Sequence, residues 1–328
     1  MNKNTLIAGL ISFFATIVSG KIAIPLLNKL KAGQPILSYV KEHEKKVGTP
    51  TMGGLFFIIP AFIAFIVFSE VNKRLSIVCL VIGLAFMIVG FLDDFLKIKN
   101  KENQGLKPYQ KIVFQLFIAV FAGFFAYKNN LSIMFIPFIK KSFDIGIFCV
   151  PFYALIFIAI TNSVNLTDGL DGLASSVSAV YLLFISIIIA IEISVFDFMY
   201  LDEKEYRNLI ILSVCMIGGL LGFLFFNTNK ASIFMGDTGS LALGGIIGAV
   251  SIFSSNALFI PIVGIMFVLS SVTVIIQVLY FKKTRKRVFL MTPFHHHLQL
   301  KGISEGKISY YYSLVTCIMG IISIIFYL

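Results

Sequence analysis

The sequence predicts an all-α polytopic membrane protein with about ten transmembrane helices in a single integral-membrane domain, residues 1–328. Of its residues, 58% are hydrophobic and only 13% are charged, and the mean hydropathy is +0.94. Soluble domains contain roughly 45–50% apolar and about 25% charged residues, so one aqueous core could not bury this much apolar surface. Ten spans of about 20 residues would use roughly 200 residues, which leaves no room for a soluble domain of ordinary size.

The expected spans are the apolar runs between polar breaks. They cover about residues 5–27, 53–70, 75–95, 110–127, 146–163, 173–192, 208–226, 239–254, 257–280 and 309–327. The first run is longer than the apolar region of a cleaved signal peptide and lacks a small-x-small cleavage site, so we expect it to be retained. Clustered glycines in the seventh and eighth runs suit close packing between helices.

The distribution of basic residues predicts the orientation. The connections between spans 1–2, 3–4, 5–6, 7–8 and 9–10, counted with their flanks, carry 18 of the 27 Lys and Arg residues, and the opposite side carries 8. Because basic loops stay in the cytoplasm, we expect these connections on the cytoplasmic face and both termini outside. Gly, Asp, Asn, Thr and His concentrate in the same connections. We therefore expect an active-site cleft on that face.

The four cysteines argue against disulfide or zinc chemistry. Cys79, Cys149, Cys215 and Cys317 each lie in or beside an apolar run, and no two of them form a CxxC pair. Neither a disulfide framework nor a zinc ribbon is expected from such wide spacing.

Two adjacent carboxylates, Asp93 and Asp94, lie where the third apolar run ends, in the string GFLDDFLK. Adjacent positions on a helix point about 100° apart. The two acids can therefore face different partners, such as a metal ion and a substrate. An interfacial acid pair can equally do no more than end an apolar helix.

The connection after the fifth run, TNSVNLTDGLDGLA, repeats amides and acids every three residues at Asn162, Asn165, Asp168 and Asp171. In a short helix or turn, this spacing gathers side-chain oxygens on one side, as a metal ion or a polar substrate requires. A helix start capped by Asp or Asn is the simpler interpretation of the same residues.

Asp237 lies in the string GDTGS, a turn that opens the eighth run. The free N–H groups of a helix start, together with a carboxylate, can hold phosphate and metal at one place. Phe234, three residues earlier, could stack on a base, although packing is the commoner role for one of 35 phenylalanines. GDTGS alone could also be no more than a helix cap.

The last cytoplasmic connection joins the basic run KKTRKR, residues 282–287, to three consecutive histidines, His295, His296 and His297. Imidazoles can bind metal or phosphate, or move protons near neutral pH. The basic run is also typical of a cytoplasmic anchor. Lys107 and Lys111, which follow the acid pair in the sequence, add cations suited to a diphosphate, although lysines near lipid head groups need no such role.

Five strings occur together in one order: GTPTMGG (48–54), GFLDDFLK (90–97), NSVNLTDGLDGLA (162–174), FMGDTGSLALGG (234–245) and PFHHHLQLKG (293–302). With these strings, the chain resembles the polyprenyl-phosphate N-acetylhexosamine-1-phosphate transferases over about residues 46–302. Contiguous histidines followed by LKG favour the muramoyl-pentapeptide branch of that family. Gln299 and Ile303 depart from the Glu and Trp of many members, which leaves sugar and peptide preference open.

The resemblance implies a Mg²⁺-dependent, multi-pass enzyme of the bacterial plasma membrane with a cytoplasmic active site. It would pass phospho-MurNAc-pentapeptide from UDP-MurNAc-pentapeptide to undecaprenyl phosphate, giving lipid I and UMP for peptidoglycan biosynthesis. Membrane lipid is a further expected partner and nucleic acid is not. A homodimer is left open.

The same resemblance implies roles for the residues that match the family's motifs. Asp237 and Asp94 would hold the metal, and Asp93 would be the base or, in a two-step scheme, the nucleophile. The groups holding the diphosphate or assisting proton movement would be Lys111, His295 and His296. The uridine pocket would comprise Lys46, Gly169, Leu170, Asp171, Asn227 and Phe234, and the adjoining substrate cleft Thr51, Asn162, Asn165, Asp168, Gly236 and His297.

Two other functions stay open at this point. A UDP-GlcNAc:undecaprenyl-phosphate GlcNAc-1-phosphate transferase would use the same loops with a different sugar. An ion or metal transporter would also place acids and histidines beside membrane spans. Its binding site belongs near the middle of the bilayer, however, whereas these residues are expected at the inner rim.

Overall fold

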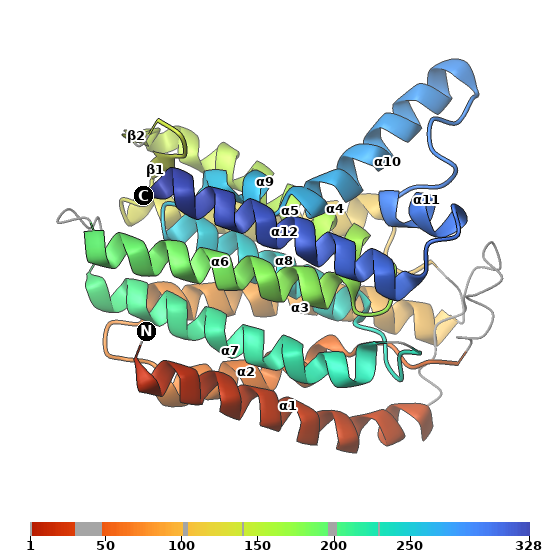
Figure 1. The fold of residues 1–328 in the computed structure, drawn as a ribbon, viewed down its shortest axis with the longest axis horizontal. Coiled ribbons are helices and arrows are strands. Elements are labelled where there is room, and N and C mark those ends of the chain that lie inside the picture. Colours follow the sequence, from red (N-terminus) through yellow and green to blue (C-terminus); the bar gives the residue numbers. More distant parts are fainter. Residues whose placement is uncertain (1, 30–47, 101–103, 140, 196–201, 229) are drawn as a thin grey trace.

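The structure, a computed structural model, describes residues 2–29, 48–100, 104–139, 141–195, 202–228 and 230–328. Within these ranges the chain forms a bundle of long helices, drawn in Figure 1. The elements are α1 (Lys3–Lys29), α2 (Gly54–Phe68), α3 (Arg74–Asn100), α4 (Pro108–Lys128), β1 (Ile133–Ile136), β2 (Lys141–Asp144), η2 (Gly146–Phe148), α5 (Cys149–Thr167), α6 (Leu173–Val195), α7 (Glu203–Asn227), α8 (Gly236–Phe253), η3 (Ala257–Phe259), α9 (Ile260–Val263), α10 (Ile265–Thr284), α11 (Phe294–Leu300) and α12 (Glu305–Tyr327).

The prediction of an all-α polytopic membrane protein is confirmed. Among the described residues, nine helices are long and apolar enough to cross a membrane, and α2 is a shorter apolar helix of 15 residues. All ten expected spans coincide with helices. Large apolar side chains on the outer helices are exposed, for example Phe14 on α1 at 60%, Phe117 on α4 at 77% and Leu279 on α10 at 63%. Such a surface suits lipid rather than water.

The ninth expected span, residues 257–280, is not one continuous helix. The short η3 and α9 come first, and the chain then leaves helical geometry at Gly264 (φ −86°, ψ 26°) before α10 begins. Pro261 lies in the first turn of α9, where its missing N–H costs no helical hydrogen bond. Figure 1 shows the consequence: α10 leaves the bundle obliquely, away from the other long helices.

A short antiparallel hairpin, β1–β2, connects α4 to the η2–α5 segment. Ile133 pairs with Asp144 at its open end. The sequence does not predict these strands, because four-residue strands leave too few residues to show a period-two pattern.

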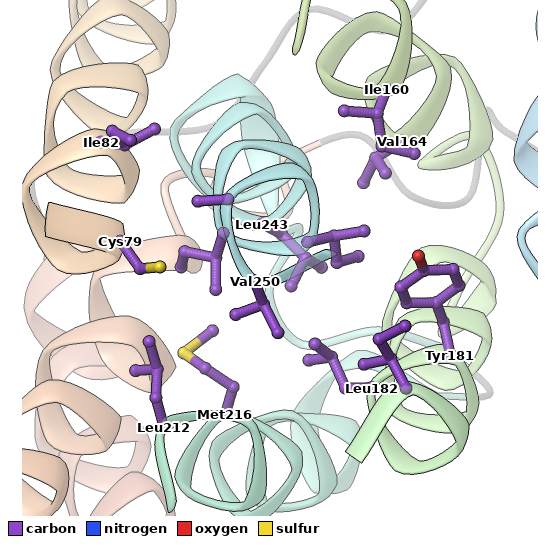
Figure 2. Packing of buried hydrophobic residues seen from close by; sticks show 14 of the residues in the cluster. Cys79, Ile82, Ile160, Val164, Tyr181, Leu182, Leu212, Met216, Leu243 and Val250 are labelled. Atoms are coloured by element: carbon purple, nitrogen blue, oxygen red, sulfur yellow. The ribbon is translucent and has the colours of Figure 1, made fainter. Parts of the chain in front are cut away.

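The centre of the bundle is α8. Every residue from Thr238 to Phe253 in this helix is buried. Figure 2 shows Leu243 and Val250 of α8 surrounded by side chains of α3, α5, α6 and α7, including Cys79, Val164 and Met216. Because α8 is fixed on all sides by apolar packing, its first turn, which carries Asp237, is held in place relative to α3 and α5.

The two ends of the bundle differ. Figure 1 shows both chain termini and the β1–β2 hairpin at one end, and α11 with the α10–α11 connection at the other. The polar loops that carry the candidate site residues lie at the end with α11. The helices therefore separate the termini from the candidate site by their full length.

Candidate active site

Three carboxylates converge where α3 passes the start of α8. Asp93, Asp94 and Asp237 each offer an oxygen, and these oxygens lie within 4.8 Å of one another. Gly90, one turn before the acid pair, permits this approach, because a Cβ there would lie 2.0 Å from the backbone oxygen of Asp237. Asp94 and Asp237, which are 143 residues apart in the sequence, are thus brought to one point, as the family resemblance implied.

Asp94 is committed to the first turn of α8. Its Oδ1 accepts a hydrogen bond from the backbone N–H of Asp237 at 3.2 Å. Its Oδ2 accepts from the N–H of Thr238 at 2.9 Å and from Thr238 Oγ1 at 2.7 Å. The first N–H groups of a helix have no partner within the helix. A carboxylate at that end also interacts favourably with the positive end of the helix dipole. Asp94 therefore caps α8 from a neighbouring helix.

Two lysines form ion pairs with Asp93 and Asp237. Lys97 Nζ lies 2.6 Å from Asp93 Oδ2 and 3.0 Å from Asp237 Oδ2, and Lys111 Nζ of α4 lies 2.8 Å from Asp237 Oδ2. The backbone N–H of Leu106 donates to Asp93 Oδ1 at 2.9 Å. The sequence analysis assigned Lys111 but not Lys97. The signal was present, since Asp93 and Lys97 stand one helical turn apart and so share a face.

Asn165, at the end of α5, completes the surroundings of Asp237. Its Nδ2 donates to Asp237 Oδ1 at 2.7 Å and to Ser240 Oγ at 2.8 Å. Asp168, the next residue of the repeat and its first acid, follows α5 directly. Burial, followed by the charges of Asp237 and Asp94, raises the pKa of Asp168 well above its usual range. The loop after α5 therefore belongs to the same electrostatic site as the three carboxylates.

His295 and His296 lie against the same loop. A Cβ built on Gly169 would lie 2.3 Å from His295 Nε2 and 3.1 Å from His296 Nε2. The two imidazole rings are 4.3 Å apart between centroids and meet edge to face. His295 is fully buried. The absence of a side chain at Gly169 is what lets α11 bring both imidazoles to this loop.

His297 points elsewhere. Its Nδ1 accepts a hydrogen bond from the backbone N–H of Leu290 at 3.1 Å, and its ring stacks on Phe294 at 5.8 Å between centroids. Desolvation, and then the charge of Lys301, lowers its pKa. These contacts tie His297 to its own loop, apart from the pair at Gly169.

Asp171 and Asn227 hold two loops together. Asp171 Oδ2 accepts from the N–H of Ala231 at 3.0 Å. Asn227 Oδ1 accepts from the N–H of Gly172 at 3.1 Å, and Asn227 Nδ2 donates to the carbonyl of Ile233 at 2.9 Å. Asp171 and Gly172 also line a cavity of about 780 Å³ that extends between the ends of α6, α7 and α12. Asp171 and Asn227, two of the residues expected in the uridine pocket, thus shape the loops beside this cavity.

The remaining expected site residues are placed as follows. The position of Gly236 is such that a Cβ on it would lie 2.5 Å from both Thr51 Oγ1 and Asp94 Oδ2. Phe234 is half-buried, and Leu170 is buried in the core. Asn162 donates to Gln115 Oε1 on α4 at 2.7 Å, so it links α5 to α4. Lys46 lies outside the described residues.

The acid cluster fits a hard divalent cation. Mg²⁺ prefers oxygen ligands and is commonly held by one or two carboxylates together with phosphate oxygens. The three converging carboxylates supply such oxygens, and the protein's own Lys97 ammonium already lies between Asp93 and Asp237. Asp237 and Asp93 direct oxygens toward that shared cation. Asp94 stays in the candidate ligand set, because each carboxylate oxygen carries more than one lone pair.

These features define a class of protein. It is a polytopic membrane protein in which carboxylates, lysines and imidazoles lie together at one end of the bundle, around the start of the buried helix α8. Comparison with known proteins agrees with it. A family model described as glycosyl transferase family 4 matches residues 76–255. Those residues run from the first turn of α3 through α8 and hence include the whole acid cluster.

Relatives cover nearly the full chain. A phospho-N-acetylmuramoyl-pentapeptide-transferase of Caldanaerobacter subterraneus subsp. tengcongensis is 41% identical over 325 residues, with 98% of each chain covered. Proteins of the same name from Clostridium novyi and Clostridium beijerinckii are each 42% identical, covering 96% and 99% of this chain and 95% and 97% of their own. The chain belongs to the phospho-N-acetylmuramoyl-pentapeptide-transferase family. It is therefore a transferase, in agreement with the resemblance inferred from its five strings.

Proposed function

We propose that this chain transfers phospho-MurNAc-pentapeptide from UDP-MurNAc-pentapeptide to undecaprenyl phosphate, giving lipid I and UMP in peptidoglycan biosynthesis. An oxygen of the acceptor phosphate forms a bond to the phosphorus that carries the sugar, and the bond from that phosphorus to UMP breaks. The observation that carries the proposal is the cluster of Asp93, Asp237, Lys97 and Lys111 beside the histidine pair. The names of the relatives support the donor's identity.

Asp93 is the proposed base. It is buried, and its two oxygens are held by the Lys97 ammonium and the backbone N–H of Leu106. A carboxylate fixed in this way can take a proton from the acceptor phosphate as that phosphate attacks. In a two-step scheme, an oxygen of the same Asp93 carboxylate would itself attack phosphorus. We keep the one-step scheme as the simpler one.

Charge stabilisation is the main task of the site. Lys97, Lys111 and the imidazole of His295 would hold the diphosphate, whose negative charge grows on the leaving UMP, and the imidazole of His296 would assist proton movement. Bound Mg²⁺, held by Asp237 and Asp94 with Asp93 beside them, would neutralise phosphate oxygens and so favour attack on phosphorus. Asn165 fixes the orientation of Asp237 through its hydrogen bond to Oδ1.

The donor's nucleoside would occupy the adjoining loops. Asp171 and Asn227 set the shape of these loops, and the half-buried ring of Phe234 offers a face for the uracil. The uridine pocket would comprise Lys46, Gly169, Leu170, Asp171, Asn227 and Phe234, and the adjoining cleft Thr51, Asn162, Asn165, Asp168 and Gly236. His297 is held by its own loop, so we assign it no direct contact with the donor.

We further propose that the chain forms one integral-membrane domain in the bacterial plasma membrane, with this site cytoplasmic and both termini outside. The end of α10, at the same end of the bundle as the site, carries the basic run of residues 282–287. Under the positive-inside rule this run belongs to the cytoplasm. A soluble nucleotide-linked donor is also made there, whereas the lipid acceptor reaches the site from the bilayer.

The deciding experiment follows UMP release by the purified protein with undecaprenyl phosphate, Mg²⁺ and either UDP-MurNAc-pentapeptide or UDP-GlcNAc. We expect release with the muramoyl donor and none above background with UDP-GlcNAc. Release with UDP-GlcNAc alone would instead establish the GlcNAc-1-phosphate transferase. Metal flux into liposomes with no UMP release from either donor would establish a transporter.

A further inference from the structure

A chain of hydrogen bonds runs behind His296, from α11 to the start of α12. Gln299, one turn after His296 on α11, is buried. His296 Nδ1 and Gln299 Oε1 are 3.1 Å apart, and Gln299 Nε2 donates to Glu305 Oε1 at 3.2 Å. The turn of Lys301 and Gly302 brings Glu305, in the first turn of α12, back to the amide.

The chemistry of these groups fixes the direction of each bond. An ionised carboxylate has only acceptors, so Glu305 must face the NH₂ group of Gln299. The amide oxygen then faces His296, and an amide oxygen only accepts. The proton of this bond must therefore be on His296 Nδ1. Because a neutral imidazole carries one N–H, His296 Nε2 is left with a lone pair.

The lone pair of His296 Nε2 lies on the side of the ring that faces the loop at Gly169. His296 Nε2 is 3.1 Å from the position that a Cβ would take on Gly169, in the loop between Asp168 and Asp171. His295 lies beside it, with 4.3 Å between the ring centroids. The Nδ1 side faces Gln299 and the Nε2 side faces the loop, so the choice of tautomer decides whether the site receives a donor or an acceptor.

We propose that Glu305 and Gln299 are positioning residues that hold neutral His296 in its Nδ1–H tautomer, with Nε2 as a hydrogen-bond acceptor toward the loop at Gly169. Glu305 fixes the orientation of the Gln299 amide, and the amide oxygen in turn fixes the tautomer of His296. Because the amide is neutral, no charge contacts the imidazole at Nδ1. This inference rests on the proposed function only for the group that Nε2 meets, a proton-bearing oxygen of the phosphorylated substrates.

The charges around His296 make the neutral amide important. His295 is its neighbour on α11, Asp168 and Asp171 flank Gly169 on the facing loop, Glu305 stands behind the amide on α12, and Lys301 follows α11. A carboxylate at position 299 would touch Nδ1 directly and favour the doubly protonated imidazolium. His296 would then present an N–H to the loop in place of a lone pair.

The test is the nitrogen NMR spectrum of the full-length protein in lipid, labelled with ¹⁵N-histidine, with His296 identified by the signals lost in His296→Gln. In wild-type protein above about pH 7.5, where an ordinary imidazole is neutral, we expect a protonated Nδ1 and an unprotonated Nε2. Glu305→Gln should produce both tautomers, because an amide at 305 can face either end of Gln299. Gln299→Glu should keep both nitrogens protonated to higher pH.

Two control variants carry the same kinds of substitution, Gln to Glu and Glu to Gln, at positions away from His296. Gln277 Oε1 accepts from the N–H groups of Val288 and Phe289, and Glu203 is an exposed partner of Arg207 on α7. Gln277→Glu and Glu203→Gln should leave the His296 signals unchanged. The pH profile of UMP release should move by about one unit or more toward alkaline pH in Gln299→Glu and stay in place in Gln277→Glu.

An Nε2–H tautomer in wild-type protein would overturn the inference. Unchanged His296 signals in both Glu305→Gln and Gln299→Glu would overturn it as well. The spectrum is independent of turnover. The expected tautomer without UMP release from either donor would therefore contradict the proposed function and leave the positioning role standing.

Discussion

Lys97 bridges Asp93 and Asp237: its ammonium lies 2.6 Å from an oxygen of the first and 3.0 Å from an oxygen of the second. The bridge joins α3 to the first turn of α8, and it places a fixed cation between the proposed base and the proposed metal ligand. A phosphate that enters this site meets a positive charge held beside both carboxylates.

Lys97→Met should lower the rate of UMP release by about 10²-fold, the usual effect of removing one fixed charge-stabilising group. Lys97→Arg should restore part of the rate. Lys99→Met is the matched control, because Lys99 lies on the same helix and is exposed. Equal rates for Lys97→Met and Lys99→Met would remove Lys97 from the site.

Thr238→Val should lower the free energy of unfolding by about 1.5–3 kcal/mol, because it removes a hydrogen bond to the buried carboxylate of Asp94. Thr316→Val is an equally buried control, whose hydroxyl donates to the carbonyl of Tyr312 in its own helix. Thermal unfolding in detergent measures both variants. A Thr316→Val variant less stable than Thr238→Val would contradict the capping role of Asp94.

Gly169→Ala should displace the imidazoles of His295 and His296, since its Cβ would overlap His295 Nε2 at 2.3 Å. We expect UMP release to fall at least about tenfold, an effect typical of small misplacements of catalytic groups. In Gly306→Ala the added Cβ meets no atom of the described part of the chain within 4 Å, so that variant should retain its activity. Full activity of Gly169→Ala would show that the contact is irrelevant to turnover.

The stability contribution of Asp168 should depend on pH. Burial, and then Asp237 and Asp94, raise its pKa in the folded state, so its ionised form opposes folding. Relative to Asp168→Asn in metal-free buffer, wild-type protein should be most stable below about pH 4, the unfolded-state pKa. That advantage should disappear as pH rises through the folded-state pKa. Melting temperatures across the pH range check this.

Asp202 is a control whose contribution to stability should depend on pH in the opposite direction. The backbone N–H of Lys204, and then Asn72, lower the pKa of Asp202. Wild-type protein should therefore gain stability relative to Asp202→Asn as pH rises above the folded-state pKa of Asp202. The same slope in both comparisons would contradict the account of Asp168.

Local sequence patterns predicted most of the helices. Apolar runs located all ten long segments, because a helix in lipid must be apolar along its whole length. The break at Gly264 was missed because Pro261 and Gly264 lie inside an apolar run that looks continuous by hydropathy. The β1–β2 hairpin was missed because its strands have only four residues each.

At the site, residue type and spacing identified the acids and imidazoles but could not assign their contacts. Helical geometry allowed Asp93 and Asp94 to face different partners, and they do: Asp94 caps α8, whereas Asp93 meets Lys97. Asn162 was grouped with Asn165, yet tertiary packing pairs it with Gln115. A hydrogen bond between α4 and α5 leaves no local signal in either sequence, so only the fold could reveal it.

The most direct test of the account is UMP release by Asp237→Asn with UDP-MurNAc-pentapeptide and undecaprenyl phosphate. Asp237 meets Lys97, Lys111 and Asn165 at once. The neutral Asn side chain of the variant cannot replace these charged contacts. It should therefore reduce the rate at least about 10²-fold while the protein stays folded in the membrane. Asp144→Asn, an exposed change in the β1–β2 hairpin, should leave the rate unchanged. A near-native rate in Asp237→Asn would contradict the proposed active site.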